Sequence, residues 1–271
     1  MTSQADTERS PALPTLARID GQTVNLATRA DAIAAMLGAA GAGHGFTLFT
    51  LNLDHLVKRR ADAAFRAAYA RATFVTADGA PVVRLTRAQS PRMQRTTGAD
   101  LVAPLCRAAA ANGVPLYLFG ATQSSLDKAA LALCAQYPGL AIAGAEAPPF
   151  GFDPLSAAAD AAAARMAESG ARIVLLALGA PKQELFADRA FAQHPGLGFV
   201  CIGAALDFIS GEQARAPKLF QVIGFEWLWR LGSQPRRLAA RYWQCALLLA
   251  DIAVVAPLRQ RWRGADPRLS L

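Results

Sequence analysis

Short apolar runs alternate with Ala-rich stretches along most of the chain. The apolar runs, each predicted to form a strand, are residues 46–52, 73–77, 115–120, 140–144, 172–179 and 198–203. The Ala-rich stretches, each with helical spacing of apolar positions, are residues 54–72, 99–112, 123–136, 155–169 and 181–193. Apolar strands separated by helices are typical of a parallel sheet covered on both faces. We therefore predict a Rossmann-like α/β domain with helices on both faces over residues 15–214.

The two ends of the chain depart from this pattern. Residues 1–14 are polar and contain proline, which predicts a mobile tail. The Asp20–Gly21 pair predicts the turn of a short ribbon. Beyond the domain we expect an aromatic-rich helix from residue 216, and a second helix from Pro235 that stops before residue 257. We treat residues 215–271 as a basic helical appendage rather than a second domain.

A Gly-rich stretch at residues 38–45 invites comparison with dinucleotide-binding loops. The dinucleotide fingerprint follows a strand and opens a helix, whereas this stretch precedes the strand predicted at residues 46–52. We therefore interpret the stretch as a flexible loop. An NAD-dependent Rossmann enzyme is disfavoured for the same reason.

Positive charge is concentrated at the C-terminal end. The net charge is +8, and residues 215–271 hold 10 of the 28 Lys and Arg but only 3 of the 20 Asp and Glu. Such a segment attracts an anionic partner, whether a phosphate, a membrane surface or a nucleic acid. The apolar run at residues 245–258 is short for a membrane span but suits an anionic interface. A helix buried on the core is the alternative.

The remaining composition predicts a cytoplasmic protein. No apolar run reaches the roughly 18 residues of a membrane-spanning helix, and the N-terminus lacks the basic-then-apolar order of a signal peptide. The four cysteines are widely spaced in apolar contexts, which predicts buried, reduced thiols.

Polar residues and glycines follow several predicted strands at the point where each strand ends. Ligands of parallel α/β sheets bind beyond these carboxyl ends. The residues delivered there are Thr50, Asn52, Asp78, Gly79, Gly120, Gly179, Gln183 and Glu184. A carboxylate such as Asp78 can act there as a catalytic acid or base, or simply cap a helix. Asn52 has the same capping alternative, and Gln183 with Glu184 can equally be solvated residues in a first helical turn.

The appendage supplies clustered arginines. Arg237 and Arg241 lie four apart and so share one helix face, with Arg230 nearby in the sequence. Guanidinium groups bind phosphates with two hydrogen bonds, so a helix folded over the sheet edge would neutralise a diphosphate; a solvated basic face is the alternative. The three histidines lack metal-ligand spacing and the chain has no D-x-D pair, so we expect no metal site and no cofactor.

An ordered set of short motifs carries a resemblance to a known family. The motifs are T-L-N-L-D-H (50–55), A-D-G-A-P-V-V (77–83), R-T-T-G-A-D-L (95–101), L-F-G (118–120), Y-P-G-L (137–140), P-P-F-G (148–151), L-G-A-P-K-Q-E (178–184), G-E-Q-A-R-A-P (211–217) and F-E-W-L-W-R-L…P-R-R…R-Y (225–242). Each motif alone is weak, but together, in this order, they resemble the WecG/TagA/CpsF bacterial glycosyltransferases over residues 45–242.

The resemblance implies a metal-independent, inverting glycosyltransferase. Members of the family move a sugar from a UDP-sugar to a saccharide on undecaprenyl diphosphate, at the inner face of the membrane. The expected donors are UDP-N-acetylmannosamine, its uronic acid, or UDP-glucose in exopolysaccharide members. The expected partners are therefore a UDP-sugar, a polyprenyl-diphosphate-linked saccharide and the cytoplasmic surface of the plasma membrane.

The resemblance also assigns roles to residues. Asp78 matches the proposed general base, Thr50 lines the same pocket and Gln183 matches a donor-pocket residue. The arginines expected to close over the nucleotide are Arg230 and Arg237. Arg241 stands where members often carry consecutive arginines, so it is expected to do that work alone. We add Arg95, from the third motif, to the expected substrate-binding residues.

A protein of a different class stays open at this point. A basic, non-catalytic protein bound to a membrane or to nucleic acid would explain the C-terminal charge but not the strand-end Asp78 and Gln183. No nucleic-acid-binding motif is recognisable, so we expect no nucleic-acid partner. A homo-oligomer is left open by the sequence.

Overall fold

The centre of the protein is a sheet of six parallel strands. The computed structural model describes residues 13–217, 220, 226–233 and 235–255. The strands are β3 (Phe46–Leu51), β4 (Phe74–Ala77), β5 (Leu116–Gly120), β6 (Ile142–Glu146), β7 (Ile173–Ala177) and β8 (Gly198–Cys201). They lie in the order β4-β3-β8-β7-β5-β6, and each neighbouring pair is parallel.

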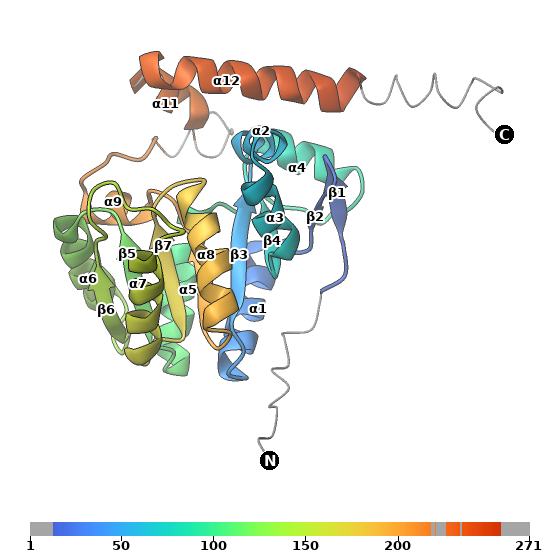
Figure 1. The fold of residues 1–271 in the computed structure, drawn as a ribbon. Helices are drawn as coiled ribbons and strands as arrows, with labels where there is room; N and C mark the ends of the chain where they lie inside the picture. The colour runs from blue at the N-terminus through green and yellow to red at the C-terminus, as the bar shows by residue number, and fades with distance from the viewer. Residues whose placement is uncertain (1–12, 218–219, 221–225, 234, 256–271) are drawn as a thin grey trace.

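Helices cover both faces of this sheet (Figure 1). Those packed into one core are α1 (Arg29–Gly41), α5 (Gly98–Asn112), α6 (Gln123–Gln136) and α9 (Ala205–Ser210). Those packed into the other are α2 (Leu53–Ala61), α3 (Ala63–Arg71), α4 (Ala80–Arg87), α7 (Ala157–Glu168) and α8 (Lys182–Gln193). The predicted α/β fold class is confirmed. The predicted ribbon is also present, as the antiparallel strands β1 (Ala17–Ile19) and β2 (Gln22–Val24).

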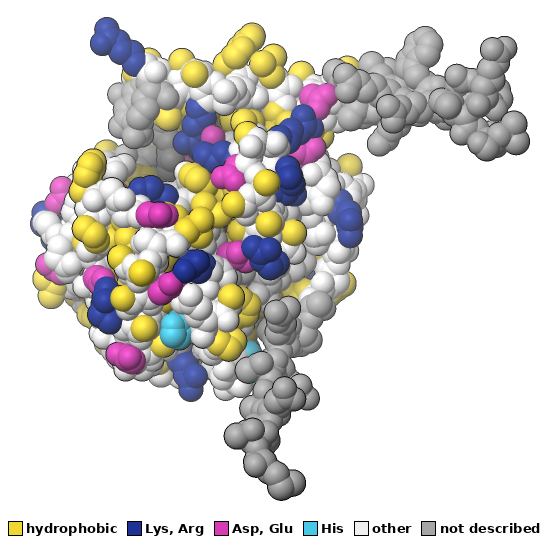
Figure 2. Space-filling view, viewed as in Figure 1, with side chains coloured by type: hydrophobic (Ala, Val, Ile, Leu, Met, Phe, Trp, Pro, Cys, Tyr) yellow, Lys and Arg dark blue, Asp and Glu magenta, His cyan; other side chains and the backbone are white. Residues whose placement is uncertain are grey.

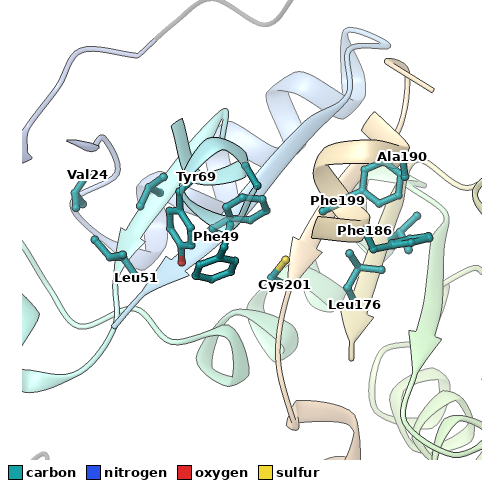
Figure 3. Close-up of a cluster of buried hydrophobic side chains, with 14 of the residues drawn as sticks. Val24, Phe49, Leu51, Tyr69, Leu176, Phe186, Ala190, Phe199 and Cys201 are labelled. Atoms are coloured by element: carbon teal, nitrogen blue, oxygen red, sulfur yellow. The ribbon is translucent and has the colours of Figure 1, made fainter. Parts of the chain in front are cut away.

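The two hydrophobic cores make the sheet a rigid platform. Alternate residues of a strand point to opposite faces, so Leu176 of β7 enters one core and Leu175 the other. Figure 3 shows the core that contains Leu176, where Phe186 of α8 lies beside that residue. The ring of Phe186 stacks on that of Phe119 with 5.1 Å between centroids. Burial of each large apolar side chain contributes about 1.5–3 kcal/mol.

The single helix predicted over residues 54–72 is wrong, because the chain breaks it at Asp62. That residue has an extended backbone, and its Oδ1 accepts hydrogen bonds from the N–H groups of Ala64 (2.8 Å) and Phe65 (3.1 Å). An N-cap of this kind starts a new helix. The segment is therefore the two helices α2 and α3.

The flexible loop predicted at residues 38–45 is also wrong in its first half. Helix α1 continues through Gly41 and ends with Ala42 as its C-cap. A methyl group added at Gly38 or Gly41 would meet no neighbouring atom within 4 Å. These two glycines therefore fill ordinary helical positions among alanines, and only the turn at residues 42–45 follows the prediction.

Smaller differences concern β6 and one cysteine. The strand predicted at residues 140–144 begins two residues later, because Leu140 is buried in the loop and its N–H bonds to the carbonyl of Tyr137 (3.0 Å). Cys134 is exposed on α6, contrary to the expectation of four buried thiols, whereas the other three cysteines are buried.

The C-terminal segment forms helices at the carboxyl end of the sheet (Figure 1). They are α11 (Glu226–Ser233), α12 (Pro235–Ala250) and a π-helical turn η1 (Asp251–Val255). Ala216 and Pro217 are not helical, so the first helix does not start at residue 216 as predicted. Residues 1–12 of the tail predicted at residues 1–14, and residues 256–271 of the predicted appendage, lie outside the described residues.

Helix α12 is held against α2. Arg241 pairs with Asp54 across this contact, with 2.9 Å between Nε and Oδ1. A second ion pair, 2.7 Å long, joins Asp251 of η1 to Arg60 of α2. Leu248 of α12 is buried in the same hydrophobic core as Leu176. The appendage therefore docks on the α/β domain through both ionic and apolar contacts.

Candidate active site

Asp78 stands at the carboxyl end of β4 and is not a helix cap. Its backbone N–H donates to the carbonyl of Leu51 (2.8 Å), so β4 is tied to β3 up to this residue. The chain then turns through Gly79, whose φ of 85° suits glycine, and α4 starts with Pro81 in its first turn. The N-cap of α4 is Gly79, which makes no side-chain capping bond. The carboxylate of Asp78 is therefore available for a role other than helix capping.

The surroundings of Asp78 raise the pKa of its carboxyl group from 3.8 to about 6. Burial is the largest cause, because a charged carboxylate loses solvation at this half-buried position. A hydrogen bond from Asn52 and the charge of Arg95 lower the pKa, while the nearby carboxylates Glu226 and Asp100 raise it. A carboxyl group with a pKa near 6 is suited to general acid or base chemistry.

Asn52 performs two tasks beside this carboxyl group. Its Oδ1 caps α2 by accepting from the N–H of His55 (3.0 Å). The same side chain hydrogen-bonds Asp78, and this bond lowers the pKa of the Asp78 carboxyl group. The capping alternative for Asn52 is therefore correct, and it does not compete with a place in the site. Thr50, buried two residues earlier on β3, is the partner of Thr76 in the strand register.

Gln183 and Glu184 are buried in the first turn of α8. Only 3% and 0% of their surfaces are exposed, so the alternative that they are solvated residues is wrong. Gln183 donates from Nε2 to Oε1 of Glu184 (2.8 Å) and accepts at Oε1 from the N–H of Gly203 (3.2 Å). Both ends of the Gln183 amide are thereby fixed. Burial raises the pKa of Glu184 from 4.5 to about 7.

Two glycines shape the edge of the sheet between β5 and β7. Gly120 approaches the backbone of Ala177 so closely that a Cβ atom would lie 2.5 Å from its carbonyl. Ala121 then takes a φ of 52°, which is strained for alanine, and Gly179 turns the chain after β7 with a φ of 72°. The chain leaves β5 towards β6 and leaves β7 in the opposite direction, towards β8. Such a reversal is where α/β sheets bind ligands.

The arginines predicted to bind substrate occupy different environments. Arg241 is engaged by Asp54, as described above. Arg230 and Arg237 lie on α11 and α12, but their side chains are outside the described part of the structure. Arg95 approaches two carboxylates, with 3.6 Å to Asp100 and 3.6 Å to Glu226. Roles in substrate binding for these four arginines stay predictions.

Some residues around Asp78 were not assigned a role from the sequence. Asp100, Arg215 and Glu226 form ion pairs here, and each lies within a motif quoted above without a stated function. His55 and Tyr69 form a buried pair, with 2.7 Å between Nδ1 and the phenol oxygen. Burial lowers the pKa of His55 to about 3, so this imidazole is neutral. The motif T-L-N-L-D-H, which ends in His55, was the sequence signal that could have pointed to this residue.

Metal-binding groups and membrane-spanning helices are both absent from the described residues. No group of three His, Cys, Asp or Glu side chains is arranged to hold a metal ion there. No helix in the same part of the chain has the length and apolar character needed to cross a membrane.

A parallel α/β sheet with a carboxyl group of raised pKa at its carboxyl edge is typical of an enzyme that binds its substrate at that edge. Comparison with protein families identifies the kind of enzyme. Residues 17–265 match the Glycosyl transferase WecG/TagA/CpsF family, and the chain belongs to that family. The protein is therefore a glycosyltransferase, and the resemblance seen in the sequence is confirmed.

Proposed function

We propose that this protein is an inverting, metal-independent glycosyltransferase that uses a UDP-sugar donor and a saccharide linked to polyprenyl diphosphate as acceptor. The donor sugar is N-acetylmannosamine, its uronic acid or glucose, and the product enters cell-envelope or exopolysaccharide synthesis. The observation that carries the proposal is Asp78, a strand-end carboxyl group of raised pKa that caps no helix and is held by Asn52.

In the proposed reaction Asp78 is the general base. Its ionised carboxylate takes the proton of an acceptor hydroxyl while that oxygen attacks the anomeric carbon. The bond from this carbon to the UDP oxygen breaks as the new bond forms, and attack from the opposite face inverts the configuration. A base in this position contributes about 10²–10⁴-fold to the rate. Fixed geometry supports it, because Asn52 and the β3–β4 register hold the carboxylate in place.

The donor is proposed to bind between the ends of β5 and β7, next to Gln183. Gly179, which turns the chain after β7, is exposed and leaves backbone open to close approach there, while Gly120 packs closely on Ala177 beside it. Gln183 is held rigidly by Glu184 and Gly203, as expected of a residue that orients a ligand. Arginines of the appendage, Arg230 and Arg237 among them, are proposed to stabilise the charge of the departing UDP.

The appendage is proposed to attach the enzyme to the cytoplasmic face of the membrane. One side of α12 is buried through Leu238, Cys245 and Leu248. On its other side Trp243 is 66% exposed and Leu247 is 54% exposed. Figure 2 shows hydrophobic side chains along the upper edge of the molecule, where α11 and α12 lie in Figure 1. An exposed apolar helix face on a basic segment suits an anionic membrane interface.

A UDP-release assay tests the proposed function. Purified full-length protein is incubated with UDP-N-acetylmannosamine, its uronate or UDP-glucose, each with and without a short-chain polyprenyl diphosphate saccharide. We expect one donor to give UDP release that depends on the acceptor and persists in EDTA, with inverted configuration in the product. No acceptor-dependent release with any donor would contradict the proposal, and loss of release in EDTA would contradict its metal independence.

A further inference from the structure

Four charged side chains form a closed ring next to Asp78. Arg95 lies 3.6 Å from Asp100 and 3.6 Å from Glu226. Arg215 lies 2.7 Å from Asp100 and 3.7 Å from Glu226. Each arginine thus contacts both acids, and each acid contacts both arginines, so positive and negative charges alternate around the ring.

The members of this ring come from three separate segments. Arg95 precedes α5, and Asp100 is in the first turn of that helix, which Thr97 caps. Arg215 lies in the segment that leaves the α/β domain, and Glu226 is in the first turn of α11. All four side chains are between 16% and 25% exposed. Shielded, networked charges interact more strongly than isolated surface pairs, so the ring is a specific link between the domain and the appendage.

Three members of the ring also influence the pKa of Asp78. The described groups that influence or face this carboxyl group are Asn52, Arg95, Asp100, Glu226 and Tyr69. Among them Arg95 lowers the pKa of Asp78, whereas Asp100 and Glu226 raise it. Glu226 is the one member of this set that comes from the appendage. It opposes the effect of Arg95 both by its own charge and by its contact with that guanidinium.

We propose that Glu226 is a positioning residue for the reaction: carried by α11, it holds Arg95 in the ring and away from Asp78, so that docking of the appendage completes the catalytic base. This inference rests on Asp78 being the base, as proposed above. Without Glu226, the carboxylates of this set that can pair with Arg95 are Asp100 and Asp78. Its pairing with Asp78 would stabilise the ionised carboxylate and make it a weaker base.

The test is a carboxyl titration of Asp78 by NMR, which needs neither donor nor acceptor. Protein labelled with ¹³C at the aspartate carboxyl carbons is titrated as wild type and as Glu226→Gln, and Asp78→Asn identifies the signal. We expect Glu226→Gln to lower the pKa of Asp78 by about one unit. Glu226→Asp, which keeps the charge, should restore part of this shift. An unchanged pKa of Asp78 in Glu226→Gln would overturn the proposal.

A matched control and a second readout separate this role from a purely structural one. Glu212, which lies just after α9, pairs with Lys128 at the surface, 2.6 Å away. Glu212→Gln should leave the pKa of Asp78 unchanged; an equal shift there would also overturn the proposal. All four tryptophans, at positions 227, 229, 243 and 262, are in the C-terminal segment, so tryptophan fluorescence monitors the appendage specifically.

Tryptophan fluorescence shows whether a change in the pKa of Asp78 comes from the lost charge of Glu226 or from detachment of α11. We expect the tryptophan emission of Glu226→Gln to stay close to that of wild type, because the appendage remains docked. The pKa of Asp78 should nevertheless be lowered. Emission matching that of the denatured protein would show that α11 has detached, and the charge-specific proposal would fail. Failure of the proposed function looks different, because Asp78→Asn would then keep wild-type UDP release whatever the titration shows.

Discussion

At the residue scale, the assigned role of Asp78 depends on its protonation state. The strand pattern and its ending in Asp-Gly placed this residue at the sheet edge from the sequence alone. Its raised pKa was not predictable in that way, because it depends on burial and on Asn52, Arg95 and Glu226, which lie far apart in the chain. The same holds for Glu184, predicted as a substrate-binding residue with a solvated first-turn position as the alternative, which is fully buried.

The first prediction concerns the pH dependence of activity. A general base must be ionised, and the pKa of Asp78 is about 6. We therefore expect kcat/KM to be constant above this pH and to fall about tenfold for each pH unit below it. A pH–rate profile of acceptor-dependent UDP release measures this. Activity that stays constant well below pH 6 would show that ionisation of Asp78 is not required.

The second prediction concerns Glu184 and stability. Its pKa in the folded protein is about 7 against an ordinary value of 4.5, so the folded state binds more protons between these values. The contribution of Glu184 to the free energy of unfolding is therefore lost as pH rises from about 4.5 to 7. Glu184→Gln keeps an oxygen to accept from Gln183 and removes the ionisable group. At pH 8 it should be more stable than wild type by ~1–3 kcal/mol.

Urea denaturation of wild type and Glu184→Gln at pH 5 and pH 8 checks this prediction. The gain should shrink at the lower pH, where Glu184 is protonated in the folded protein. Glu168→Gln is a matched control, because Glu168 is an exposed carboxylate on α7. A Glu184→Gln protein less stable than wild type at pH 8 would show that its carboxylate is ionised and paired when folded.

At the scale of elements, the apolar runs predicted the sheet well because fully buried strands have a distinct pattern. All six strands of the sheet were expected, and only β6 was displaced. The helices were harder. The Ala-rich composition hides boundaries, so the break at Asp62 was missed, and α1, α4 and α9 were not predicted. The division at Asp62 depends on one side chain accepting two backbone hydrogen bonds, which apolar periodicity does not reveal.

The third prediction tests that division. Asp62→Ala removes the acceptor for the N–H groups of Ala64 and Phe65 at the start of α3. Loss of such an N-cap costs about 1 kcal/mol. Chemical denaturation should show a lower unfolding free energy by this amount, whereas Glu168→Ala, at the exposed end of α7, should have little effect. Equal stabilities of Asp62→Ala and wild type would show that Asp62 does not hold the start of α3.

At the scale of the whole molecule, α12 of the appendage has one face buried and another exposed. The basic composition of the appendage predicted an anionic partner, and its apolar run left open whether it packs on the core or meets a membrane. Leu248 is buried in the core while Trp243 is exposed, so different faces of α12 have different environments. The ring of Arg95, Asp100, Arg215 and Glu226 was not predictable, since it joins three distant segments.

The fourth prediction concerns the exposed face of the appendage. Replacing Trp243 and Leu247 together by serine removes two exposed apolar side chains without touching the buried face. Binding to vesicles with anionic lipid should weaken at least about tenfold, since each buried side chain contributes about 1.5–3 kcal/mol. Vesicle co-sedimentation measures this. The control is Leu131→Ser, which removes a leucine of α6 that is 74% exposed; equal losses in both proteins would show that the α12 face is not the membrane contact.

The most direct test of the central claim is the turnover of Asp78→Asn with the donor that supports UDP release. Asparagine keeps the shape of the side chain but cannot accept the proton. We expect kcat to fall by about 10² or more, while donor affinity, measured by calorimetry, stays close to wild type. Asp188→Asn, at a half-buried carboxylate of α8 that pairs with Arg71, should retain full turnover. Near wild-type turnover in Asp78→Asn would contradict the assignment of the base.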